Sequence, residues 1–277
     1  MSSRTELPPR WPMSTGPAGT VSLLCVVVLT IIAVWPELFS PFNPALRVGA
    51  PYLGPSSNHL FGTDEIGRDQ FSRVIFAIRF TWLPALAITG ATFVLGSAIG
   101  IASAFAGRWI DQIVQRSIDV IFLVPSMLFA VAIAATLGPG IGNSMIAIMV
   151  SWWPWYARLA GDEYRRIKAT PHYQAAEMSG TSKWRLVSVY GAPGTLPSLV
   201  VAAGLDVSNV ITTLSLLSFL GLGQLDPAPE LGAMISRSLD SLTAFWWIPI
   251  FPAMAVFFLS LVANMFADSA RSALRGR

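Results

Sequence analysis

The sequence predicts an all-α membrane protein with six transmembrane helices and with both termini in the cytoplasm. Three observations lead to this prediction. Hydrophobic residues make up 53% of the chain and charged residues only 12%, against about 25% charged residues in ordinary soluble domains. Six separate segments are long and apolar enough to cross a bilayer, and the basic residues between them gather on one side. This composition excludes a soluble globular protein.

A helix that crosses a bilayer needs about 20 mostly apolar residues. The first candidate, Thr20–Trp35 with an extension to Phe39, follows Arg4 and Arg10 as the core of a signal peptide would. No small-x-small cleavage site follows it, so we expect an uncleaved first helix. The other candidates are Trp82–Phe105, Val120–Leu137, Ile141–Leu159, Leu196–Leu222 and Trp246–Met265.

These segments divide the chain into five parts, and a proline-rich composition marks the third of them as partly irregular. The expected parts are a cytoplasmic tail at 1–19, the first transmembrane helix at 20–39, an extracytoplasmic loop with an amphipathic segment at 40–79, a five-helix core at 80–270 with a polar cytoplasmic loop at 161–193, and a cytoplasmic tail at 271–277.

Lysine and arginine in the connecting segments set the orientation, because short cytoplasmic loops carry an excess of these residues. With the N-terminus inside, 13 of the 18 basic residues are cytoplasmic and five are extracytoplasmic. The five are Arg47, Arg68, Arg73, Arg79 and Arg237. This asymmetry places both termini and loop 161–193 in the cytoplasm.

The sequence also limits the chemistry of the chain. The lone Cys25 excludes a disulfide within the chain and a thiolate metal cluster. His59 and His172 are far apart and have no second ligand pattern beside them, so we expect no metal site. A phosphate-binding Gly-x-x-x-x-Gly-Lys-Ser/Thr motif is absent, which argues against an ATPase. We therefore expect no catalytic residues and no bound cofactor.

Loop 161–193 is a polar, basic stretch between two apolar segments. Tyr173 and Ala176 lie in a run of small and apolar residues before a break at Gly180, and Trp184 begins a second run with helical spacing. We expect two short helices in water at this point. Their mixed composition predicts that they bind another protein.

This loop resembles the coupling loop of bacterial ABC-importer permeases, in which Glu-Ala-Ala, Gly and Ile-x-Leu-Pro follow at fixed spacing. The residues at those positions are Gln174, Ala175, Ala176, Gly180, Tyr190, Ala192 and Pro193, of which Gln174, Tyr190 and Ala192 depart from the pattern. The alanines would let a short helix approach a partner closely, and glycine permits a sharp turn. The resemblance implies that Gln174, Ala175, Ala176, Gly180, Trp184 and Pro193 form the ATPase-coupling loop, with Trp184, Leu186 and Val187 anchoring its second helix.

Three further stretches are similar to permeases of the dipeptide/oligopeptide/nickel importer group, above all to its C-type subunit. They are His59–Asp69 before the second span, Leu217–Gly223 with Pro227, Pro229 and Gly232 before the last span, and Ala267–Leu274, which resembles the closing Gly-Asp-x-x-Arg-x-x-Leu pattern with alanine for glycine. Their order and spacing are those of the family from His59 to Leu274.

The resemblance implies a type I ABC-importer permease fold and a transmembrane subunit of an ATP-driven importer in the bacterial plasma membrane. The implied partners are a second, homologous permease in a heterodimer, two ATPase subunits that bind ATP and Mg, and an extracytoplasmic substrate-binding protein. Di- or oligopeptides are the expected cargo. The same importer type for nickel or another small solute is the alternative, followed by an ion-coupled secondary transporter, which would need more intramembrane charges than Asp206.

Some motifs also have structural explanations, which we favour over ligand contact. Thr63 before two acidic residues suits the start of a helix, Ser218–Gly223 suits a helix end, and the glycines at 90, 96 and 100 suit close helix packing.

Asp206 lies within the fifth apolar segment, where a charge costs about 2.5–3.5 kcal/mol on insertion scales. We therefore expect it to face the protein interior or a wet cavity. Asn209 and Thr213 follow at helical spacing, and with Asp206 they could line the translocation path. Alternatively, Asp206 hydrogen-bonds a neighbouring helix or lies nearer the cytoplasmic edge. The sequence favours neither explanation.

Overall fold

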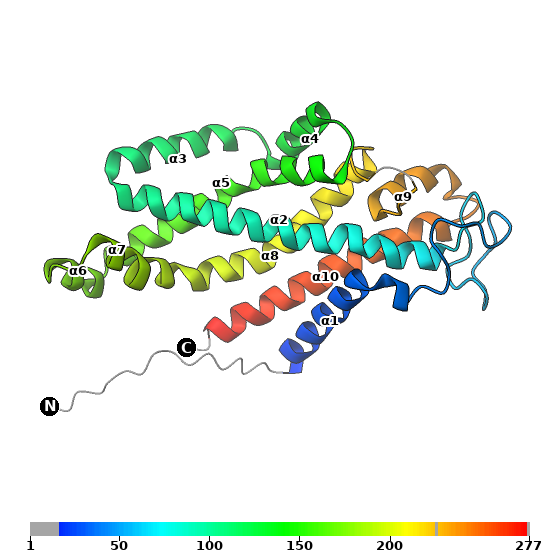
Figure 1. Ribbon diagram of the computed structural model, residues 1–277, viewed down its shortest axis with the longest axis horizontal. Coiled ribbons are helices and arrows are strands. Elements are labelled where there is room, and N and C mark those ends of the chain that lie inside the picture. The colour runs from blue at the N-terminus through cyan, green and yellow to red at the C-terminus, as the bar shows by residue number, and fades with distance from the viewer. Residues whose placement is uncertain (1–16, 225–226, 276–277) are drawn as a thin grey trace.

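The computed structural model describes residues 17–224 and 227–275, and this part of the chain is a bundle of long helices (Figure 1). The helices are α1 (Pro17–Val34), α2 (Gln70–Ala106), α3 (Arg108–Phe122), α4 (Ser126–Leu137), α5 (Ile141–Lys168), α6 (Pro171–Met178), α7 (Lys183–Arg185), α8 (Ala192–Phe219), α9 (Leu231–Ser238) and α10 (Trp247–Arg275). Short turns of helix lie at η1 (Pro36–Leu38), η2 (Leu186–Gly191) and η3 (Leu239–Ser241). The all-α prediction is confirmed. Most of the predicted tail at 1–19, and the last two residues, lie outside the described residues.

Helix α2 runs through the centre of the bundle and packs against α5, α8 and α10. Its contact with α5 is close enough to exclude side chains: a Cβ atom on Gly100 would lie 2.1 Å from the Ala157 carbonyl oxygen, and one on Gly96 would lie 2.5 Å from the Trp153 carbonyl oxygen. A Cβ atom added to Gly90 would instead point into open space among the described residues. The close-packing prediction is therefore confirmed for Gly96 and Gly100, and within this chain it is not met at Gly90.

Helices α7 and α8 are one continuous rod. The π-helical segment η2 joins them without a turn, so that Lys183–Phe219 forms a single helix of 37 residues. This rod ends as predicted, because the Leu222 N–H donates to the Leu217 carbonyl and Gly221 adopts a φ of +82°. The helix begins at Lys183, well before Leu196, where the predicted span starts.

In the part of the chain that the structure describes, three helices are long and apolar enough to cross a membrane: Gln70–Ala106, Lys183–Phe219 and Trp247–Ser272. The predicted third span, Val120–Leu137, is not one helix. Helices α3 and α4 meet there at an 82° bend, and as a pair they would make a fourth span. Pro125 explains the break, because its ring disfavours helical geometry in the preceding residue.

The remaining predicted spans are also helical, with shifted ends. The second, Trp82–Phe105, is the later part of α2, which begins at Gln70. The fourth starts at Ile141 as predicted but continues beyond Leu159 to Lys168. Figure 1 shows that α6 and α7 lie at one end of the bundle, and that loop 40–69 and α9 lie at the other.

Residues 40–69 form an irregular loop that packs on the first turns of α2. Thr63 does not cap that helix; its hydroxyl donates to the Ala50 carbonyl at 2.7 Å. The cap is Asp69, whose Oδ2 accepts from the backbone N–H of Ser72 at 2.8 Å, while its Oδ1 lies 2.8 Å from His59 Nδ1. The structural role predicted for this segment is supported, but the capping residue was wrong.

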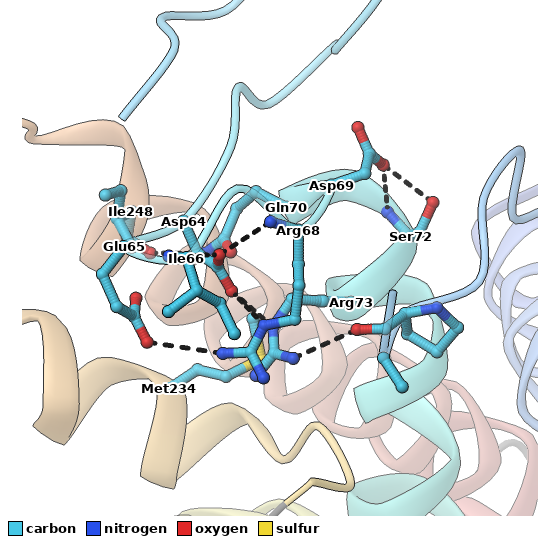
Figure 2. A network of polar contacts seen from close by, with 12 residues as sticks. Asp64, Glu65, Ile66, Arg68, Asp69, Gln70, Ser72, Arg73, Met234 and Ile248 are labelled. Atoms are coloured by element: carbon cyan, nitrogen blue, oxygen red, sulfur yellow. Dashed lines mark hydrogen bonds and ion pairs between the residues drawn. The ribbon is translucent and has the colours of Figure 1, made fainter. Parts of the chain in front are cut away.

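A buried charge network ties this loop to α2 (Figure 2). Asp64 Oδ2 lies 2.6 Å from Arg68 Nε and 3.4 Å from Arg73 Nε, and all three residues are at most 7% exposed. Arg73 Nη1 also donates to the Pro44 carbonyl at 3.2 Å. Glu65 joins only at the edge, 3.3 Å from Arg68 Nη2. One buried carboxylate thus orients two buried guanidinium groups and balances one of their two positive charges.

The carboxyl group of Glu230 caps α9 and gives a testable pH dependence. Its Oε2 accepts from the Ala233 N–H at 3.0 Å, and the residue is 1% exposed. Burial raises the pKa of this carboxyl, and the hydrogen bond opposes the shift only in part. An acid with a raised pKa in the folded state stabilises the fold at low pH and loses that contribution as pH rises through the folded pKa. As the pH rises above the usual Glu pKa of about 4.3, we therefore expect the Tm of the purified complex to fall more steeply than that of Glu230→Gln. Parallel Tm profiles would contradict this assignment.

Candidate functional site

Loop 161–193 is the first candidate site, and the structure builds it as α6, a tight turn and the start of the long rod. Thr170 caps α6 by accepting from the Tyr173 N–H at 3.4 Å. Gly180 has a φ of +76°, which favours glycine, and the Thr181 N–H then donates to the Ala176 carbonyl at 3.2 Å. The predicted break at Gly180 is confirmed, whereas the second short helix is the first turn of a much longer one.

The inner face of this loop is anchored in the bundle. The hydroxyl groups of Tyr173 and Tyr164 lie 2.9 Å apart, which links α6 to α5. Tyr164, Tyr173 and Leu186 are each at most 4% exposed and form a cluster with Ala104 of α2. The partly buried members of this cluster include Ala176, Val187 and Tyr190. The loop is therefore held in a fixed place by packed side chains from three helices.

The outer face of the loop carries two large apolar side chains that are mostly exposed. Met178 is 83% exposed and Trp184 is 78% exposed. Gln174, Ala175 and Pro193 are exposed as well. Of the three residues expected to anchor the second helix, Leu186 and Val187 pack on the inner face, and the Trp184 indole lies outside. Met178 was not among the predicted site residues, although its apolar side chain in a polar loop is the signal that marks it.

Ion pairs tie the same end of the bundle together. Arg165 of α5 contacts Asp111 of α3 at 2.5 Å and Asp162 at 2.6 Å. Nearer the α3–α4 break, Arg158 pairs with Asp119, and its guanidinium group lies 5.0 Å from the centre of the Phe122 ring. These contacts fix α3 against α5.

Asp206, the second candidate site, is bound to the neighbouring helix α5. Its Oδ1 accepts from Trp152 Nε1 at 3.0 Å, and its Oδ2 accepts from the Tyr156 hydroxyl at 2.9 Å. Asn209 Nδ2 lies 3.5 Å from Oδ1. The residue is 6% exposed. One of the two explanations that the sequence left open, a hydrogen bond to a neighbouring helix, therefore describes the contacts seen.

Asp206 also lines a cavity of about 470 Å³ between the α3–α4 break, α5 and α8. The lining residues are Phe122, Ser126, Ser151, Trp152, Trp155, Ala202, Leu205, Asp206 and Asn209. Thr213 is not among them: it is buried, and its hydroxyl donates to the Asn209 carbonyl at 2.9 Å. The structure thus brings Asp206 and Asn209 together at the cavity and leaves Thr213 outside it. The described residues contain no group of three or more His, Cys, Asp or Glu side chains that could hold a metal ion.

Comparison with known proteins assigns the chain to a protein family. Residues 96–277 match the family described as "Binding-protein-dependent transport system inner membrane component". The chain belongs to this family of ABC transporter permeases. The permease is 32% identical to the Probable D,D-dipeptide transport system permease protein DdpC of Escherichia coli (strain K12), over 95% of this chain and 89% of that protein.

Two further relatives cover the permease almost as fully. It is 33% identical to the dipeptide transport system permease protein DppC of Alkalihalophilus pseudofirmus, over 92% of this chain and 84% of that protein. It is 31% identical to the glutathione transport system permease protein GsiD of Pectobacterium atrosepticum, over 91% of this chain and 84% of that protein. The predicted family is confirmed.

The fold of the permease has a counterpart among solved structures. A chain of the MetNI methionine ABC transporter, in inward-facing conformations, superposes with a TM-score of 0.56 at 15% identity and covers 72% of this chain and 96% of its own. The permease is therefore a multi-pass helical protein of the inner membrane with an importer-type fold. The ATPase activity of such a transporter lies in partner subunits, and the permease needs no cofactor of its own. Because the chain belongs to this family, the alternative of an ion-coupled secondary transporter is excluded.

Proposed function

We propose that the permease carries di- or oligopeptides into the cytoplasm of a bacterium. The observation that supports this cargo is the set of relatives named for dipeptides and glutathione, which match over more than nine-tenths of the chain. Nickel or another small solute is the alternative cargo, carried by the same type of importer.

The proposed assembly is a heterodimer with a second, related permease, two ATPase subunits on the cytoplasmic side and a binding protein on the other. We propose six spans, formed by α1, α2, the α3–α4 pair, α5, the rod of α7 and α8, and α10. The start of α1 and the end of α10 lie toward the end of the bundle that carries α6 (Figure 1). This arrangement supports cytoplasmic termini and a cytoplasmic loop 161–193, as does the distribution of basic residues.

Loop 161–193 is the proposed contact with the ATPase subunits. Its inner face is fixed by Tyr173 and Leu186, and its outer face offers Trp184 and Met178 to a partner. Tryptophan is enriched at the energetic centres of protein interfaces. Because the loop is continuous with α8, movement of the docked ATPase subunits would be transmitted directly to a transmembrane helix.

The cargo is tested by uptake into proteoliposomes. The purified importer, with its partner subunits and binding protein, is expected to accumulate radiolabelled L-alanyl-L-alanine only when ATP is present on the ATPase side. Uptake of ⁶³Ni²⁺ with a chelator, measured in the same vesicles, tests the alternative. Nickel uptake without peptide uptake would overturn the proposed cargo.

The coupling surface is tested with Trp184→Ala. Truncation of a central interface tryptophan costs about 2 kcal/mol, or about 30-fold in affinity. We expect a loss of bound ATPase subunits and of binding-protein-stimulated ATP hydrolysis of about that size, because the exposed indole contributes little to the fold.

Trp109→Ala is the matched control, since Trp109 is 80% exposed but lies on α3, outside the loop. It should keep normal coupling. Equal loss in both variants, or none in Trp184→Ala, would refute the docking role of the loop.

A further inference from the structure

The cavity beside Asp206 has the composition of a binding site for a cation. Its walls include three aromatic side chains, Phe122, Trp152 and Trp155, and Asp206 is the ionisable residue that lines it. Its volume of about 470 Å³ lies within the range of small-ligand pockets, about 300–1,000 Å³. Aromatic faces attract a cation that has lost part of its water, and a carboxylate supplies the opposite charge.

The hydrogen bonds to Asp206 orient its carboxylate without neutralising it. The donors are an indole, a phenol and an amide, from Trp152, Tyr156 and Asn209. A carboxylate offers about four lone-pair positions. Three of them are used here, two on Oδ1 and one on Oδ2, so Oδ2 can accept a further hydrogen bond. Within residues 17–224 and 227–275, no ion pair joins Asp206 to a basic side chain. Arg158, the cation that contacts the cavity wall at Phe122, is paired with Asp119.

The position of the cavity suits a transported ligand. It lies where α3 and α4 break at 82°, and interrupted membrane helices commonly form substrate sites near the middle of the bilayer. Phe122 at the end of α3 and Ser126 at the start of α4 both line it. A negative site at this depth would remain costly without a positively charged ligand.

We propose that this cavity holds the protonated amino group of a peptide in transit, with the Asp206 carboxylate as its counter-ion and Trp152 and Trp155 as aromatic walls. The inference rests on the proposed peptide transport and adds the chemical group that the permease itself recognises. Trp152 has two functions in this arrangement: its N–H orients the carboxylate, and its ring faces the ligand.

Fluorine NMR of the assembled importer labelled with 5-fluorotryptophan tests this directly. The Trp152 signal is assigned as the one that is missing from Trp152→Phe, and the Trp155 signal from Trp155→Phe. Titration with L-alanyl-L-alanine amide, a cation, is expected to shift both signals at a concentration at least tenfold lower than the neutral N-acetyl-L-alanyl-L-alanine amide. Asp206→Asn should remove this preference.

The comparison of the two amides in the unsubstituted protein is decisive even where Asp206→Asn fails to assemble. Equal responses to both amides, no response, or an equal response to K⁺ at the same concentration would each overturn the amine site. Uptake separates this inference from the proposed cargo. An importer that takes up no peptide but prefers the cationic amide has the amine site and another cargo. One that takes up peptide without this preference lacks the site.

Discussion

Replacing Gly100 by valine is expected to prevent assembly of the importer. A Cβ atom at this position would lie 2.1 Å from the Ala157 carbonyl oxygen, which belongs to the backbone of α5 and cannot turn aside. Helices α2 and α5 would have to move apart along their whole contact. Overpacking typically costs about 1–3 kcal/mol and sometimes more, and we expect the upper end or beyond because the obstacle is a helix backbone. The yield of folded complex, measured by size-exclusion chromatography, should fall at least tenfold.

Gly90→Val is the matched control on the same helix, because no atom of the described residues lies within 4 Å of its added Cβ. It should assemble with a Tm close to that of the unsubstituted protein. Normal assembly of Gly100→Val would mean that α2 and α5 are farther apart than the structure places them.

Asp64→Asn is the second substitution for which we expect a large effect. It keeps the size of the side chain but leaves the guanidinium groups of Arg68 and Arg73 buried without their shared carboxylate (Figure 2). Removal of one partner from a buried ion pair costs about 3–5 kcal/mol. We expect a fall in Tm and faster proteolysis of loop 40–69, which the network holds against α2.

Glu65→Gln is the control at the neighbouring position. Its side chain is 40% exposed and makes one 3.3 Å contact with Arg68, so we expect a cost of about 0–1 kcal/mol. If the two variants were equally stable, the network would contribute nothing beyond surface charge pairs.

The sequence predicted the helical membrane class and the family well, because both depend on composition and on motif spacing. It predicted the α3–α4 break poorly, since Pro125 lies within an apolar run that satisfies the length test for a span. The early start of α2 was missed for a related reason. Gln70 and Arg73 look like loop residues by hydropathy, and they become helical because buried partners satisfy them: the Ile248 carbonyl at 2.7 Å and Asp64.

The candidate sites were predictable to different degrees. The Gly180 turn follows from local backbone geometry, so the position could be read from the sequence. The orientation of Trp184 depends on which neighbours fill the inner face of the rod. Asp206 shows the same limit: its spacing to Asn209 is local, whereas its bonds to Trp152 and Tyr156 come from another helix.

If the continuous helix from Lys183 to Phe219 tilts as one body, it acts as a lever. Trp184 and Asp206 lie on the same helix, 22 positions apart in the sequence, which corresponds to about 33 Å along its axis. A tilt of about 5° about either point would displace the other by about 3 Å at this rise per residue. Such a displacement is comparable to the length of a hydrogen bond. A small swing of loop 161–193 is therefore large enough to make or break single contacts around Asp206.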